Sequence, residues 1–207
     1  MKITDIKSLG DGYKYNIFIE DKCIENVDYD FVVTFDLNAG KEINSDVAAM
    51  LFNYEEFSAA LKKAYNILSF RSHGKKELIK KLMSKNIEKQ AAEYAAFYMV
   101  QKGYINDENY AIELLEYYNG KGFGKSRIRT EMIKKGLSKD IIDDVLEDFE
   151  NDYKKIREIL QNRYSVQDLK DKKIKNRAVS YLLRQGYSYD EIFSQIRDYT
   201  EEYDEIY

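Results

Sequence analysis

The sequence contains few of the residues on which most catalytic and metal sites depend. Its 207 residues include no proline, no tryptophan, one histidine and one cysteine. The single Cys23 excludes a disulfide within the chain and a zinc site made of several thiolates. His73 has no second histidine, and the sequence suggests no serine or cysteine partner for it. We therefore expect no bound metal and no cofactor, and we do not expect His73 to be catalytic.

Proline and long apolar runs are also missing. The absence of proline is typical of a mostly helical chain, because proline breaks helix interiors. No segment approaches the roughly 18 consecutive apolar residues of a membrane span, and residues 1–10 lack the apolar run of a signal peptide. Hydrophobic residues still make up 44% of the chain, which is enough to form a packed core. We expect a cytoplasmic monomer that makes no contact with a membrane.

Charge is present in abundance, but it is unevenly distributed. The formal net charge of -4 hides an alternation of acidic and basic segments. A solvated helix face would explain any one basic segment, whereas repeated alternation indicates a periodic surface. Counted along the chain, the net charge is −7 over 1–60, +7 over 61–89, +5 over 119–137, −6 over 138–153, +5 over 170–186 and −6 over 187–207.

The sequence repeats, without gaps, at a period of 50 residues. Each copy has a lysine at its start, a stripe of apolar residues at helical spacing and a helix-stop residue at its end. Glycine, and next to it asparagine, readily adopts the left-handed conformation that ends a helix. The aligned residues are Lys75, Lys125 and Lys175; Leu82, Met132 and Leu182; and Asn86, Gly136 and Gly186.

Further helices are predicted on either side of each repeated segment. Ser138 can cap the second helix of one copy, and Ser188 with Glu191 forms the capping-box pattern in the next. An apolar stripe also precedes each repeated segment. Each repeat is then a unit of three helices, too small to bury much surface alone, so neighbouring copies should share a core. The predicted repeats span 51–104, 105–150 and 151–207.

Residues 1–50 follow a different pattern. The alternation from Tyr13 to Ile19 predicts a strand, Gly10–Gly12 predicts the turn before it, and Ile3 with Ile6 indicates a partner strand. The apolar run 31–35 fits a short helix or a strand, and periodicity does not decide between them. We expect a small β-rich cap, followed by a helix from about Ser45.

Several of these segments resemble the RecX family of bacterial recombination regulators. The likeness runs in order over positions 57 to 200, and residues 1–50 are similar to the extension of Gram-positive-type members. The segments that carry it are 71–78 with Lys81-Leu82 for the first repeat, 102–107 with Tyr110-Ala111 for the junction, 124–129 with 134–137 for the second repeat, and 182–187 for the third.

The resemblance implies a fold and a function. The fold would be mainly α, with three tandem three-helix repeats in an elongated curved array and a small β-rich cap at the N-terminus. The chain would be a negative regulator of the RecA recombinase, with no catalytic residues and no enzyme activity of its own. It would bind the RecA–DNA filament, through which it could reach DNA, and inhibit the recombinase and coprotease activities, thereby modulating DNA repair, recombination and the SOS response.

A basic face is the candidate binding surface. Cations that lie off the apolar stripes should face solvent and could meet a filament of protein and DNA. A solvated surface explains them too, and common descent of the copies explains the repeated lysines equally well. The candidate partner-binding residues are Arg71, Lys75, Lys76, Lys80, Lys81, Lys125, Arg127, Arg129, Lys134, Lys175, Arg177 and Arg184.

Two other functions remain compatible with the sequence. Three-helix units with basic second helices resemble helix-turn-helix domains, so the chain could bind single-stranded or duplex DNA directly. It could also be a helical scaffold for an unrelated protein. The segment Gly120–Ser126 superficially resembles a phosphate-binding loop, but it lacks that loop's spacing and no strand precedes it. We interpret it as a flexible connection between helices.

Overall fold

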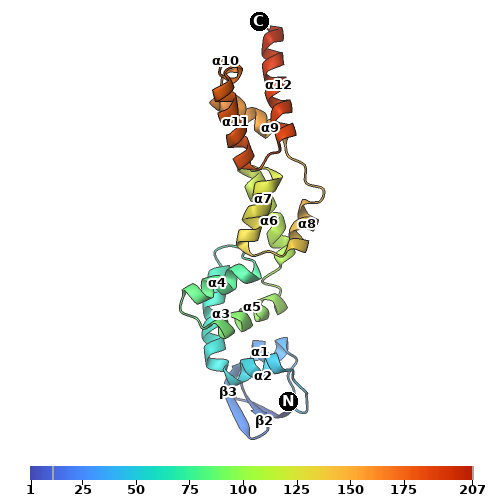
Figure 1. Ribbon diagram of the computed structural model, residues 1–207. Helices are drawn as coiled ribbons and strands as arrows, with labels where there is room; N and C mark the ends of the chain where they lie inside the picture. The colour runs from blue at the N-terminus through green and yellow to red at the C-terminus, as the bar shows by residue number, and fades with distance from the viewer. Residues whose placement is uncertain (11, 207) are drawn as a thin grey trace. The chain divides into compact units, whose positions relative to one another are not determined.

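The computed structural model describes the backbone of residues 1–10 and 12–206 and the side chains up to Glu201 (Figure 1). It consists of two compact units, Met1–Asn106 and Asp107–Tyr207. The described residues are mainly helical, with one small antiparallel sheet near the N-terminus, as the sequence predicts. None of the helices in this described part is long and apolar enough to cross a membrane.

The sheet has three strands in the order β1-β2-β3. The first two, β1 (Ile3–Ser8) and β2 (Lys14–Ile19), are the predicted ones; Asp11, in the predicted turn between them, lies outside the described residues. The sequence pattern missed β3 (Lys22–Asp28). Its alternation is interrupted where Asn26 adopts a positive φ of 59° and the register with β2 shifts.

Helices pack beside the sheet around an aromatic core. Residues 31–35, which the sequence left undecided, fall mostly in α1 (Tyr29–Thr34), and α2 (Ser45–Phe52) begins where predicted. The ring of Phe31 lies 5.4 Å from that of Phe57 and 6.1 Å from that of Tyr98, between ring centroids. This aromatic cluster joins the cap to the first helices that follow it.

The first three-helix segment has a core made largely of alanine. It comprises α3 (Tyr54–Leu68), α4 (Lys75–Ser84) and α5 (Lys89–Gln101). Alanines of α3 and α5 are buried around Leu78 and Leu82, so the helices can approach closely. Asn86 has a φ of 60°, which confirms its predicted role as the residue that ends this helical segment.

The second unit contains two successive groups of helices. Gly136 and Gly186 have φ angles of 90° and 98°, which confirms both predicted helix stops. Ser138 also caps the next helix as predicted, accepting a hydrogen bond from the N–H of Ile141. The helices are α6 (Asp107–Gly120), α7 (Lys125–Lys135), α8 (Lys139–Leu146), α9 (Tyr153–Arg163), α10 (Val166–Lys170), α11 (Lys172–Gln185) and α12 (Tyr189–Ile206).

Two features of the last group differ from the sequence-based expectation. The short α10 was not predicted; it begins with a capping box formed by Ser165 and Asp168. Helix α11 begins at Lys172, so the prediction that Lys175 stands at a helix start was wrong. The reason is local, because the carboxylate of Asp171 accepts hydrogen bonds from the first N–H groups of α11 and fixes the helix start there.

Candidate interaction surface

The basic residues around α4 fall into two groups. Arg71, in the turn before the helix, forms an ion pair with Glu77, with 2.8 Å between Nη2 and Oε1. Lys76 and Lys80 are exposed on α4, whereas Lys75 and Lys81 are half-buried. Among the predicted residues of this copy, therefore, Lys76 and Lys80 are exposed on the helix itself, whereas Arg71 is exposed but paired with Glu77.

His73 lies beneath this basic turn and is buried, with 2% of its surface exposed. Its Nδ1 is 2.8 Å from the carbonyl oxygen of Arg71, and because a carbonyl only accepts, Nδ1 carries the proton. The other nitrogen, Nε2, is buried without a hydrogen-bond partner among the described residues. Burial lowers the pKa of His73, so the ring is held in its neutral form.

Helices α7 and α11 meet through their backbones. The N–H of Gly124 donates to the carbonyl of Gln185 at 2.8 Å, and the N–H of Ser126 donates to that of Gly186 at 3.3 Å. The unpaired donors at the start of α7 thus satisfy acceptors at the end of α11. A Cβ on Gly124 would lie 2.5 Å from the carbonyl carbon of Gly186, so this contact leaves no room for a side chain.

Arg127 belongs to this junction and is half-buried, so it faces solvent only in part. Its guanidinium carbon lies 3.7 Å from the ring centroid of Phe123, and its Nη1 donates to Oε1 of Gln185 at 2.6 Å. A weaker contact at 3.4 Å reaches the carbonyl of Arg184. Helical periodicity places Arg127 off the apolar stripe correctly, but it does not indicate that a second copy of the repeat covers that side.

Three other predicted cations of α7 are engaged within the same unit. Arg129 forms an ion pair and hydrogen bond with Asp143, which hold the pKa of that carboxyl below its usual range. Lys134 pairs with Glu131 at 2.8 Å. The Nζ of Lys125 lies 3.4 Å from the carbonyl oxygen of Glu147. The basic residues of α7 therefore make more contacts within their own unit than the sequence indicated.

The predicted cations of α11 are more accessible. Lys175 is half-buried, with Nζ 5.6 Å from the ring centroid of Phe193. Arg177 and Arg184 are exposed, and neither guanidinium lies within ion-pair distance of a carboxylate in the described part of the chain. These two arginines are accessible and lack a carboxylate partner among the described residues, whereas Lys134, which is also exposed, is paired with Glu131.

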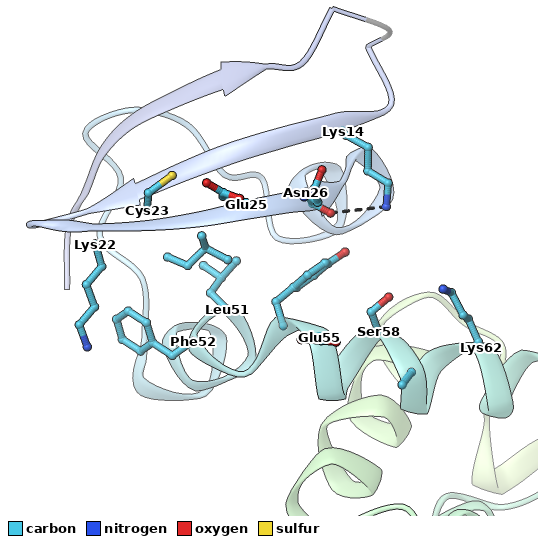
Figure 2. Close-up of a pocket in the computed structure, with 13 residues that line it drawn as sticks. Lys14, Lys22, Cys23, Glu25, Asn26, Leu51, Phe52, Glu55, Ser58 and Lys62 are labelled. Carbon is cyan, nitrogen blue, oxygen red and sulfur yellow. Dashed lines mark hydrogen bonds between the residues drawn. The ribbon is translucent and has the colours of Figure 1, made fainter.

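A cavity of about 860 Å³ in the first unit lies between β3 and helices α2 and α3 (Figure 2). Lys14, on its rim, is already paired with Asp28 at 2.6 Å. Lys22, from β3, lies over the ring of Phe52 at 4.8 Å. The charged lining residues have mixed sign, because the lysines are accompanied by Glu25 and Glu55. This cavity is consequently not a selective site for anions or for cations.

A second cavity, of about 370 Å³, lies within the second unit. It is bordered by the turn between α6 and α7 and by residues of α9 and α11. Its cations are Lys121, Lys155 and Arg163, which the sequence analysis did not select. They lie on different elements and outside the 50-residue register, so periodicity gave no signal for them. A count of lysines and arginines on the polar face of α9 could have identified two of the three.

Comparison with known proteins identifies relatives of this arrangement. The family model described as "RecX, second three-helix domain" matches residues 106–146. A regulatory protein RecX from Caldanaerobacter subterraneus is 31% identical over 166 residues, which cover 79% of this chain and 84% of that protein. A regulatory protein RecX from Clostridioides difficile is 26% identical over 86% of this chain and 85% of its own length.

Solved structures share the fold. A crystal structure of a regulatory protein RecX matches 95% of this chain and 98% of its own, with a TM-score of 0.66 at 19% identity. RecX from Lactobacillus salivarius matches 70% of this chain and 97% of its own, with a TM-score of 0.59 at 27% identity. With the helical repeats, the helix stops and the identity to the Caldanaerobacter protein taken together, the chain belongs to the RecX family of regulatory proteins.

Proposed function

We propose that this chain is a negative regulator of the RecA recombinase that binds the RecA–DNA filament and inhibits its recombinase and coprotease activities. Its membership of the RecX family of regulatory proteins is the observation that carries the proposal. The 50-residue repeat supports it, because a periodic surface suits a periodic partner such as a filament. The corresponding repeats would span 51–104, 105–150 and 151–207, and the protein would act by binding alone.

The predicted basic face contains two kinds of cation. Some are accessible to a partner, and others hold neighbouring helices together. Lys76 and Lys80 of the first unit, with Arg177 and Arg184 of the second, have accessible head groups. Arg127 and Arg129 are engaged inside the second unit. We therefore assign filament contact to the first group, and the positioning of neighbouring helices to the second.

DNA-dependent ATP hydrolysis by RecA tests the proposal directly. The parent protein should lower the steady rate in proportion to its concentration, and R177E/R184E should require more protein for the same inhibition. The effect should weaken as salt rises, because exposed charges are screened over about 8 Å at physiological ionic strength. K172E/K173E, which reverses two exposed lysines at the other end of α11, is the matched control. A parent protein that leaves RecA hydrolysis unchanged would contradict the proposal.

A second candidate function is direct binding of nucleic acid by the chain itself. The observation that favours it is the cavity bordered by Lys121, Lys155 and Arg163, where the lining charge is predominantly positive. Retardation of single-stranded DNA by this protein in the absence of any recombinase would distinguish the two functions. The filament proposal requires RecA to be present, whereas the nucleic-acid proposal does not.

A further inference from the structure

We propose that the cavity at the turn between α6 and α7 is a binding site for a phosphate oxyanion, supplied by the backbone of a nucleic-acid strand. The inference rests on the second candidate function above, binding of nucleic acid by the chain itself. It assigns that function to Lys121, Lys155 and Arg163, rather than to the repeated basic positions that the sequence analysis selected.

The charge around the cavity is predominantly positive. Among the described residues, no carboxylate lies within ion-pair distance of Lys121, Lys155 or Arg163. Glu158 also lines the cavity and is exposed, as Lys121 and Arg163 are, so the lining carries three positive charges against one negative charge. Three like charges around one hollow repel one another, and an anion placed between them would relieve that repulsion. By contrast, Arg129 and Lys134 on α7 already have carboxylate partners.

Neutral groups hold these cations in position without neutralising their charge. Lys155 donates to the backbone carbonyl of Asn119 at 2.6 Å and to its side-chain oxygen at 2.8 Å. Both acceptors are uncharged, and an ammonium group has three donors, so one remains for a ligand. The guanidinium carbon of Arg163 lies 4.5 Å from the ring centroid of Tyr181, and the Nζ of Lys121 lies 4.1 Å from the ring centroid of Tyr117. Such cation–π contacts orient a cation and leave its charge intact.

The backbone carbonyls of the turn between α6 and α7 also have hydrogen-bond donors. A carbonyl oxygen that points into an anion site repels the ligand, so it must be occupied or turned away. The carbonyl of Gly122 accepts the hydroxyl of Tyr187 at 2.9 Å, and that of Asn119 accepts Lys155. The acceptor of Gly122, which lines the cavity, and that of Asn119, which comes directly before the lining residue Gly120, are therefore already occupied by donors. The sequence segment Gly120–Ser126 lacks the architecture of a phosphate loop, yet side chains from α9 supply the cations that its backbone does not.

The same contacts define what the site would recognise. The guanidinium of Arg163 covers the ring of Tyr181, so this ring offers less surface for stacking a base. The remaining groups are point charges that suit phosphate oxygens and carry no information about base identity. The cavity volume of about 370 Å³ is at the lower end of small-ligand sites. We therefore infer binding that is independent of nucleotide sequence.

Fluorescence anisotropy of a fluorescein-labelled oligothymidine, with the full chain and no recombinase, tests the inference. K121Q/R163Q should weaken binding about tenfold and lower the slope of log affinity against log salt by about 0.7 for each phosphate contact removed. The matched control, K139Q/K172Q, removes two exposed cations of the same unit that do not line the cavity, and should change affinity much less. Circular dichroism of each variant checks that the helices persist.

Each outcome decides a specific point. If the parent protein does not bind the oligonucleotide, direct nucleic-acid binding itself fails. If it binds but both double variants weaken it equally, the site is overturned and only overall charge matters. Competition by inorganic phosphate or ATP identifies the source of the oxyanion. Displacement of the oligonucleotide by ATP at far lower concentration than by inorganic phosphate would overturn the assignment to a nucleic-acid strand in favour of a free nucleotide, whereas weak competition by both supports a strand.

Discussion

Helices α7 and α11 are two copies of one repeated segment within the same unit, yet their equivalent arginines have different surroundings. Arg127 of α7 packs on Phe123 and donates to Gln185, whereas Arg177 of α11, 50 residues later, is exposed. Both copies have an arginine here, at the same angular position on the helix. Packing of the neighbouring copy then decides whether that cation contributes to stability or is available to a partner.

The largest expected effect concerns the glycine at the end of α11. Gly186→Ala would force a Cβ to within 2.4 Å of the backbone nitrogen of Arg127, at a φ of 98°. We expect a loss of about 3 kcal/mol in the free energy of unfolding, from left-handed strain together with steric overlap. Urea denaturation measures it. Gly103→Ala is the control, because its φ of 75° brings strain but no neighbour lies within 4 Å; its loss should be about 1 kcal/mol. Equal losses would show that the α7–α11 contact is not close.

A smaller effect separates the two arginines. Arg127→Gln should lower the free energy of unfolding by about 1.5 kcal/mol, because it removes the contact with Phe123 and the hydrogen bond to Gln185. Arg177→Gln should stay within about 0.5 kcal/mol of the parent, as exposed surface changes usually do. Thermal or urea denaturation of both variants provides the comparison. If Arg127→Gln were as stable as Arg177→Gln, the two arginines would contribute equally to the free energy of unfolding, and the comparison would fail.

The serine caps of the helices that follow α7 and α11 should differ in the opposite direction, with the larger effect in the later copy. Ser188 and Glu191 exchange hydrogen bonds at the start of α12, at 2.7 and 3.3 Å, while Ser138 makes a single bond of 3.4 Å at the start of α8. Ser188→Ala should cost about 1 kcal/mol of stability, and Ser138→Ala about half of that. Urea denaturation measures both values. A larger loss for Ser138→Ala would reverse the order that the distances imply.

The smallest effect extends the comparison to the first copy, where His73 stands at the position that Phe123 occupies in the second. Burial lowers the pKa of His73, so the unfolded chain binds its proton more readily than the folded protein. The parent should therefore lose stability as pH falls through about 6.5, the ordinary pKa of histidine. His73→Phe should lack this loss, and the stability difference between the two proteins should shift in favour of the variant from pH 7 to pH 5. Urea midpoints at both pH values test this. Parallel pH dependence would show that other groups titrate instead.

The 50-residue register correctly predicted the residue that ends the repeated helix in each copy, but not where that helix begins in the third. Glycine or asparagine at the helix stops, and serine at the caps, are signals contained in a few neighbouring residues, and the structure confirms them. Strand β3 escaped prediction because Asn26 interrupts its alternation. The packing of Arg127 and the cavity around Lys155 also escaped, because both depend on which elements meet across 30 to 60 residues of chain.

The hydrogen bonds between the start of α7 and the end of α11 bear on how the second unit comes apart. In many repeat proteins each copy can fray separately, because neighbouring copies share only side-chain contacts. Here, melting α11 would expose the N–H groups of Gly124 and Ser126 at the start of α7. The two copies should consequently open as one cooperative block, and the amide protons of Gly124 and Ser126 should exchange with deuterium as slowly as those in the middle of α11.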